Sequence, residues 1–144
     1  MKAAGTKRIV VDASVTLAWC FQDERTPFSE AVLDLLAANG EAVSPAIWPL
    51  EIANALLVGE RRKRLTSADI GAVLKRIADL PIFVDLIRVR DVFGAILFLA
   101  REEQLSVYDA SYIELALREG LPLATLDKRL RDAARHRGVA LVRT

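Results

Sequence analysis

Four carboxylates of the sequence fall at junctions between predicted secondary-structure elements, where a strand has just ended or a helix has just begun. They are Asp12, Glu51, Asp109 and Asp127. In open α/β sheets, ligands bind in the crevice outside the carboxyl ends of the strands. We therefore expect these four side chains to meet at one edge of a parallel sheet, although they are far apart in the sequence.

Four carboxylates in one place repel one another and take up protons unless a positive charge joins them. The chain has one cysteine and one histidine, so the ligands on offer are oxygens. Sites made of oxygen ligands favour Mg²⁺ or Mn²⁺ over zinc. The usual chemistry of such a site is hydrolysis of a phosphodiester by metal-activated water, without a side-chain nucleophile. We predict that the four acids are both the metal ligands and the catalytic groups.

Each acid also has a purely structural interpretation. Asp127 could simply cap a helix, and Asp109 has the same ambiguity because acids favour helix N-termini. Glu51 could be an ordinary early-turn glutamate. Asp12 is the hardest to explain in this way, because Ser14 could meet the capping need of the helix that follows. Ser14 and Asn54 could also orient carboxylates or water by hydrogen bonding.

The elements that must position these residues alternate along the chain. Strands are expected at 9–11, 41–44, 82–87, 121–125 and 139–142. Helices are expected at 13–21, 27–38, 48–63, 66–80, 92–103, 109–119 and 128–136. This alternation predicts an α/β fold, with helices on both faces of a central, mostly parallel sheet of four to five strands.

Length and composition describe an ordinary globular protein. With 144 residues, 53% of them hydrophobic, the chain is about the size of one domain, which we expect to span 1–144. No stretch approaches the roughly 18 apolar residues of a membrane span, and the basic segment 1–8 lacks the apolar core of a signal peptide. We expect a cytoplasmic protein with no membrane partner. The most apolar window, 92–100, is predicted to be a buried helix.

Four segments, taken together, resemble the successive motifs of PIN-domain ribonucleases. They are VVDAS at 10–14, EIANAL at 51–56, SVYDASY at 106–112 and LATLDKRL at 123–130. Each motif is short, but the set occurs in order and spans nearly the whole chain. The resemblance is closest to VapC-like toxins of prokaryotic toxin–antitoxin pairs.

This resemblance implies a PIN-like three-layer α/β/α sandwich and an endoribonuclease that depends on Mg²⁺ or Mn²⁺. The four acids match the metal-site acids of the family. Ser14 and Thr125 match positions that support those acids, and Asn54 stands where a small polar residue is common. The resemblance also implies an RNA substrate, a homodimer and a cognate antitoxin whose tail covers the active site.

Basic residues gather in the run 61–64 and in the segment 128–143. Such patches could steer a polyanion, and the candidates for RNA binding are Arg61, Arg62, Lys128 and Arg129. For the run 61–64 we favour a simpler interpretation, a solvated helix end that interacts well with the helix dipole.

Three alternatives remain open. The first is a PIN-type nuclease of RNA maturation or decay that has no antitoxin. The second is a receiver-like phosphoacceptor domain, which also gathers acids and Mg²⁺ at a sheet edge; it is less favoured because Asp12 is followed by Ala13 and Ser14 rather than by an adjacent acid. The third is a binding module with an inert metal site.

Overall fold

The computed structural model describes residues 7–144, and its centre is a four-stranded parallel sheet with the strand order β3-β2-β1-β4. The strands are β1 (Arg8–Val11), β2 (Glu41–Ser44), β3 (Ile82–Val84) and β4 (Leu123–Ala124). The predicted fifth strand at 139–142 is reduced to one parallel bridge between Leu123 and Leu141. A longer ladder cannot form there because β4 itself has only two residues.

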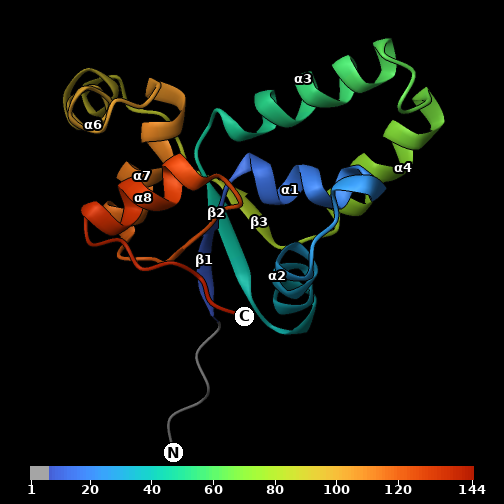
Figure 1. Cartoon of the computed structure of the whole chain (residues 1–144), viewed down its shortest axis with the longest axis horizontal. Helices are drawn as coiled ribbons and strands as arrows, with labels where there is room; N and C mark the ends of the chain where they lie inside the picture. Colours follow the sequence, from blue (N-terminus) through green and yellow to red (C-terminus); the bar gives the residue numbers. More distant parts are fainter. Residues whose placement is uncertain (1–6) are drawn as a thin grey trace, which may run out of the picture.

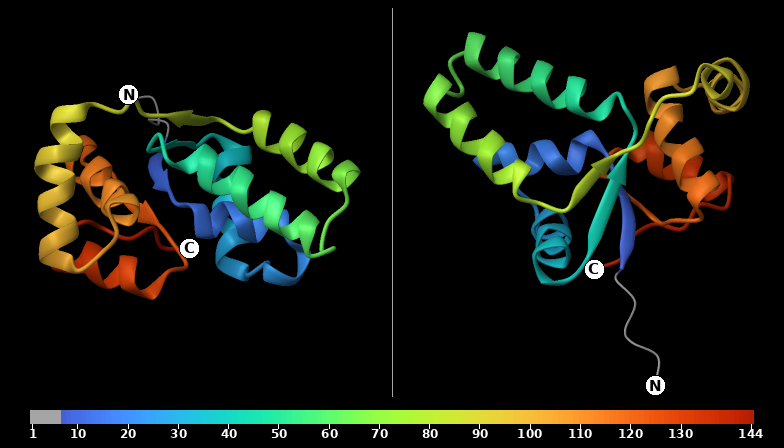
Figure 2. Two further views of the ribbon diagram at one scale, coloured as in Figure 1. Left: turned by 90° about the horizontal axis from the view of Figure 1, so that it is seen from above. Right: turned by 180° about the vertical axis from the view of Figure 1, so that it is seen from behind.

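Helices cover both faces of this sheet, with α1 to α4 on one side and α6 to α8 on the other (Figures 1 and 2). Their bounds are α1 (Ala13–Cys20), η1 (Gln22–Glu24), α2 (Pro27–Ala38), α3 (Trp48–Arg61), α4 (Ser67–Ala78), α5 (Val89–Asp91), the π-helical turn η2 (Val92–Ile96), α6 (Leu97–Glu103), α7 (Val107–Glu119) and α8 (Lys128–His136). The predicted three-layer α/β/α arrangement is confirmed.

Strand β1 is buried on both faces, as its unbroken apolar run predicts. Ile9, Val10 and Val11 are all 0% exposed. Because successive side chains of a strand point to opposite faces, Ile9 and Val11 pack into a core with α1 and α2, whereas Val10 packs into the core that contains α7 and α8. The polar residue that follows the strand is therefore held at a fixed place in the middle of the sheet.

The apolar window 92–100 is helical, but the prediction that it is buried is wrong. Ile96 and Leu99 are buried, whereas Phe93 is 74% exposed and Phe98 is 52% exposed. One side of this helical segment packs on α7, so its other apolar side chains face outward. Composition alone does not distinguish such a helix from a fully buried one.

In the described part of the chain, no helix is both long enough and apolar enough to cross a lipid bilayer. Residues 1–6, which belong to the basic segment named above, lie outside the described residues.

Candidate active site

Asp12 lies at the carboxyl end of β1 and is only 4% exposed. It is also the N-cap of α1, because its Oδ1 accepts a 3.1 Å hydrogen bond from the Val15 N–H. The idea that Ser14 caps this helix is wrong. The Ser14 hydroxyl instead donates a 2.7 Å hydrogen bond to Asp12 Oδ1, so it supports the carboxylate as the other interpretation predicted.

The loop after β4 is attached to the same carboxylate. Thr125 Oγ1 donates a 2.5 Å hydrogen bond to Asp12 Oδ2 and accepts one of 3.0 Å from the Asp127 N–H. The Leu126 N–H donates to Ser14 Oγ at 2.9 Å. Both Asp12 oxygens are therefore oriented, and these hydrogen bonds join the turn after β1 to the turn after β4.

Asp127 is the N-cap of α8, so its capping interpretation is correct. Its Oδ1 accepts hydrogen bonds from the N–H groups of Arg129 and Leu130 at 2.8 and 3.2 Å. Its Oδ2 accepts none from the residues that the structure describes. Capping uses one oxygen and leaves the other available to a further ligand.

Glu51 stands in the first turn of α3, and Tyr112 of α7 reaches it from the opposite layer. The Tyr112 hydroxyl donates a 2.8 Å hydrogen bond to Glu51 Oε1. Tyr112 is 1% exposed, so its ring packs in the core. Sequence reasoning did not include Tyr112 in the site. Its position three residues after Asp109 was the available signal, because that spacing places both side chains on one helix face.

Asp109 is partly buried in the first turn of α7. Its backbone N–H donates a 3.0 Å hydrogen bond to Ser106 Oγ, which caps the helix. Because Ser106 is the cap, no capping role accounts for the side chain of Asp109.

Burial and mutual repulsion raise the pKa values of three of these acids. Burial raises the pKa of Asp12 to about 6, although the hydrogen bonds from Thr125 and Ser14 lower it, and the charge of Asp127 raises it further. Burial and the charge of Asp127 raise the pKa of Asp109. Burial raises the pKa of Glu51, the Tyr112 hydrogen bond lowers it, and the charge of Asp109 raises it. The charge of Asp127 therefore acts on Asp12 and Asp109, and the charge of Asp109 acts on Glu51.

No lysine, arginine or histidine among residues 7–144 forms an ion pair with any of the four acids. A cluster of carboxylates without a cationic partner is the donor set that a hard divalent cation fits. Within the same residues, no three acidic, cysteine or histidine side chains converge closely enough to enclose an ion by themselves. The four carboxylates therefore interact through their charges, but they do not close around an ion in this structure.

The remaining predicted residues are not gathered at the acids, with one exception. Asn54 is exposed on α3, and Arg61 and Arg62 are exposed at the other end of that helix, about 15 Å along its axis from Glu51. Lys128 is exposed and pairs with Asp132 at 2.8 Å. Arg129 is the exception, because its charge lowers the pKa of Asp109 while its Nη2 donates to the Gln104 carbonyl at 2.7 Å.

Comparison with known proteins gives a family and a set of similar folds. The family model described as PIN domain matches residues 9–136. The chain is similar to PAE2754 from Pyrobaculum aerophilum, with 25% identity, a TM-score of 0.66, and coverage of 89% of this chain and 86% of that one. It shares its fold with FitAcB from Neisseria gonorrhoeae, with 18% identity, a TM-score of 0.59, and coverage of 94% and 96%. No curated protein sequence matches.

Proposed function

The chain belongs to the PIN domain family of nucleases, and on this basis we propose that it is a metal-dependent endoribonuclease and the toxin of a toxin–antitoxin pair. The observation that carries the proposal is the set of four carboxylates that form no ion pair within residues 7–144, three of which, Asp12, Glu51 and Asp109, have pKa values raised by burial and by a neighbouring acid of the set. Family membership also favours a nuclease over the receiver-like alternative.

In the proposed reaction the acids Asp12, Glu51, Asp109 and Asp127 hold one or two Mg²⁺ or Mn²⁺ ions. When bound, such an ion lowers the pKa of a water molecule and offsets the charge on the departing oxygen of the phosphodiester. The residues around the acids determine their orientation. Thr125 and Ser14 direct the two oxygens of Asp12, and Tyr112 directs one oxygen of Glu51.

The toxin role and the RNA substrate are supported by the four motifs at 10–14, 51–56, 106–112 and 123–130, which resemble those of VapC-like toxins. An antitoxin that inhibits the enzyme would cover the acids, and a basic group on it would pair with carboxylates that form no ion pair within residues 7–144. Arg129, beside Asp109, is the candidate for contact with the RNA backbone.

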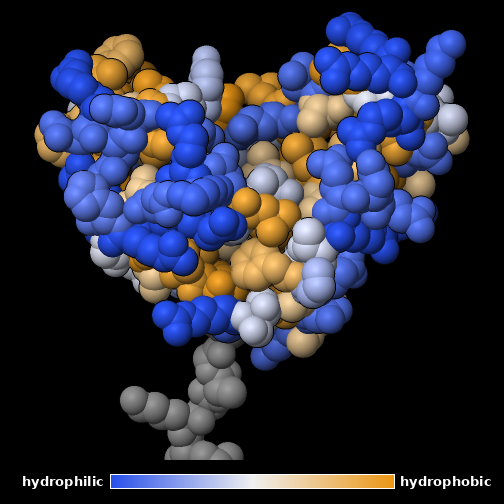
Figure 3. All heavy atoms as spheres, in the orientation of Figure 1, coloured by the Kyte–Doolittle hydropathy of each residue, from blue (hydrophilic) through white to orange (hydrophobic). Residues whose placement is uncertain are grey.

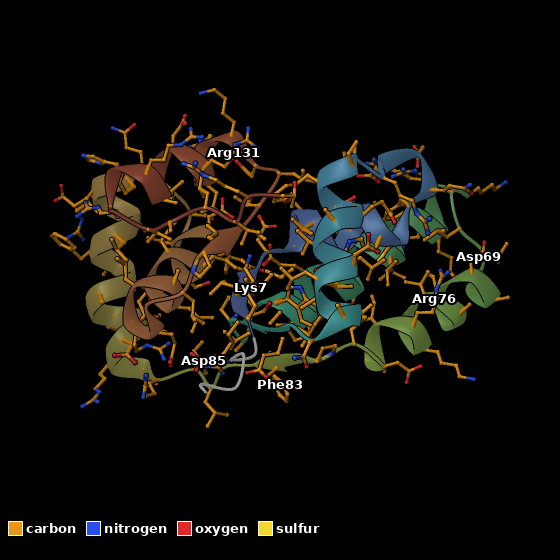
Figure 4. The ribbon with its side chains drawn as sticks, turned by 90° about the horizontal axis from the view of Figure 1, so that it is seen from below. Lys7, Asp69, Arg76, Phe83, Asp85 and Arg131 are labelled. Atoms are coloured by element: carbon orange, nitrogen blue, oxygen red, sulfur yellow. The ribbon has the colours of Figure 1, made fainter. Side chains whose placement is uncertain are left out.

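The proposed homodimer is supported by an exposed apolar surface formed by β3, the segment after it and the start of α5 and η2. Its exposed side chains are Phe83, Val84, Leu86, Ile87, Val89 and Phe93. Leu86 is 85% exposed, and Figure 4 shows Phe83 at the outer edge of the molecule. Exposed apolar side chains gathered in one segment of the chain are typical of a protein–protein contact. We place the contact between the two copies here.

The nuclease activity is tested with the purified chain, a single-stranded RNA and a DNA of the same sequence, in Mg²⁺ and in EDTA. We expect cleavage of the RNA in Mg²⁺ only. Asp12→Asn and Asp109→Asn should each reduce the rate by at least about 100-fold, because removal of a metal ligand prevents productive binding of the ion. The matched control is Asp34→Asn, which makes the same chemical change on the exposed face of α2. Cleavage that survives EDTA or Asp12→Asn contradicts the proposal.

The toxin role is tested separately in cells. Expression of the chain should arrest growth, expression of the Asp12→Asn variant should not, and co-expression of a short neighbouring reading frame should restore growth. An active nuclease that leaves growth unchanged would instead support the alternative of RNA maturation or decay.

A further inference from the structure

A hollow in the surface of the molecule lies between α8, the C-terminal segment 138–143 and Phe28 of α2. Its volume is about 640 Å³, and its floor is apolar. The floor is formed by Leu123, Leu126, Val139, Leu141 and Val142. Figure 3 shows hydrophobic side chains at the surface here, between the hydrophilic surface over α8 and the surface over α2. We call this hollow the arginine groove, after the residues at its rim.

The rim carries positive charge that is largely uncompensated. Arg131, Arg135 and Arg143 line the groove, and no carboxylate from the described residues 7–144 does. Arg135 is 3.7 Å from Asp132, whereas Arg131 and Arg143 form no ion pair with any residue from 7 to 144. A second hollow of about 630 Å³, beside α1 and α4, has Asp23 and Asp69 among its arginines. An anionic ligand is therefore favoured in the arginine groove in particular.

The groove adjoins the acid cluster. Thr125 and Leu126 line it, and the same two residues are hydrogen-bonded to Asp12 and Ser14 on the other side of their loop. Asp127 is the next residue in the chain. The loop 125–127 therefore separates the acids from the arginine groove. A flexible polyanion that is bound at the acids reaches the groove by crossing this loop.

We propose that the arginine groove binds the single-stranded RNA next to the bond that is cut, with the arginines on its phosphates and the apolar floor under an unstacked base. Binding sites for single strands combine a positive groove with side chains on which bases stack, and the partly buried ring of Phe28 is available for that purpose. Duplex RNA keeps its bases stacked inside the helix, so the apolar floor would have no role. This inference rests on the proposed ribonuclease function.

The lining of the groove fits single-stranded RNA better than it fits an acidic protein segment. Such a segment satisfies the arginines but leaves the apolar floor uncovered, whereas a nucleotide offers both an anion and a flat apolar surface.

The test measures fluorescence anisotropy of a labelled 12-nucleotide single-stranded RNA with the full chain in EDTA, where no cleavage occurs. The double substitution Arg131→Gln/Arg135→Gln should weaken binding about tenfold and reduce the slope of log affinity against log salt by about 1.4, which is about 0.7 for each lost phosphate contact. Arg143→Gln, near the end of the chain, should lower the slope by about half as much without any effect on α8. The control Lys75→Gln/Arg76→Gln removes the same charge from α4, and Figure 4 shows Arg76 far from Arg131.

Equal RNA affinity for the groove variants and the wild type overturns the inference. So does an equal loss in the α4 control, which would indicate only general attraction. Loss of binding to a poly-glutamate peptide, with RNA binding retained, assigns the groove to an acidic protein segment and also overturns it. These outcomes leave Mg²⁺-dependent RNA cleavage by the wild type intact. A wild-type chain that neither binds nor cleaves RNA overturns the proposed function together with this inference.

Discussion

The Tyr112 hydroxyl of α7 donates a 2.8 Å hydrogen bond to Glu51 Oε1 of α3, which joins two layers of the fold across 61 residues of sequence. Burial raises the pKa of Tyr112, and the nearby charges of Glu51 and Asp12 raise it further. The phenol therefore stays protonated and remains a donor at every working pH. It fixes one oxygen of Glu51 while leaving the other to a metal ion or its water.

The substitution Tyr112→Phe should weaken Mn²⁺ binding by about tenfold, the lower end of the range for groups that orient metal ligands. The ring is kept, so packing changes little, but Glu51 loses its donor and its pKa rises further. Titration calorimetry at pH 7 measures the affinity. Tyr108→Phe is the control because Tyr108 is 61% exposed. Equal Mn²⁺ affinities for the two variants would show that Tyr112 only packs.

The substitution Thr125→Val should move the acidic limb of the pH–rate profile to higher pH. Burial raises the pKa of Asp12 to about 6 and the Thr125 hydrogen bond opposes that rise, so removing the hydroxyl raises the pKa further. Metal binding needs the ionised carboxylate, so the loss of activity should be largest near pH 6 and smaller at pH 8. Thr125→Ser keeps the donor and should restore the wild-type profile. A loss that is the same at all pH values would instead indicate a structural effect.

The substitution Asp12→Asn should change how the stability of the metal-free protein depends on pH. The folded-state pKa of about 6 lies above the ordinary value of 3.8, so folding favours the protonated acid. The contribution of Asp12 to the free energy of unfolding is fully present below about pH 4. It falls by about 3 kcal/mol as the pH rises through 6. Relative to Asp12→Asn, the wild type should therefore become less stable between pH 4 and pH 8.

Urea unfolding in EDTA at several pH values measures this difference. Added Mg²⁺ should restore stability to the wild type at pH 8 but not to the variant, because only the wild type retains the ligand. A wild-type curve parallel to that of Asp12→Asn would show that the acid is not held in an unfavourable charged state.

The substitution Phe93→Glu should convert the proposed homodimer into a folded monomer. Phe93 is 74% exposed, so a glutamate there leaves the core of each copy intact. In the dimer, however, the glutamate would be buried at the contact without a cationic partner, which is unfavourable. Light scattering coupled to gel filtration gives the mass, and circular dichroism checks the fold. Leu74→Glu, at a 46% exposed position of α4, should leave the mass unchanged. A monomeric mass for the wild type would refute the proposed homodimer.

The sequence alone determined the features that depend on neighbouring residues. The unbroken apolar run at 9–11 predicts a strand buried on both faces, and Val10 and Val11 are indeed fully buried. The helices expected at 27–38 and 66–80 are both present, and a threonine, Thr26 or Thr66, forms a capping box at the start of each. The junction positions of the acids also follow from local pattern, because a strand or helix end is recognised from a few adjacent residues. The common α/β arrangement then follows from the alternation of strands and helices.

Only the tertiary structure decided which side chains meet. It showed that Asp12 caps its own helix while Ser14 supports it, that Tyr112 holds Glu51, and that the window 92–100 has an exposed apolar face. These relationships depend on how separate layers pack, and the same local sequence is compatible with more than one packing partner. The charge of the acid cluster is likewise a property of the folded chain, because burial and proximity raise the pKa values only after four distant segments have come together.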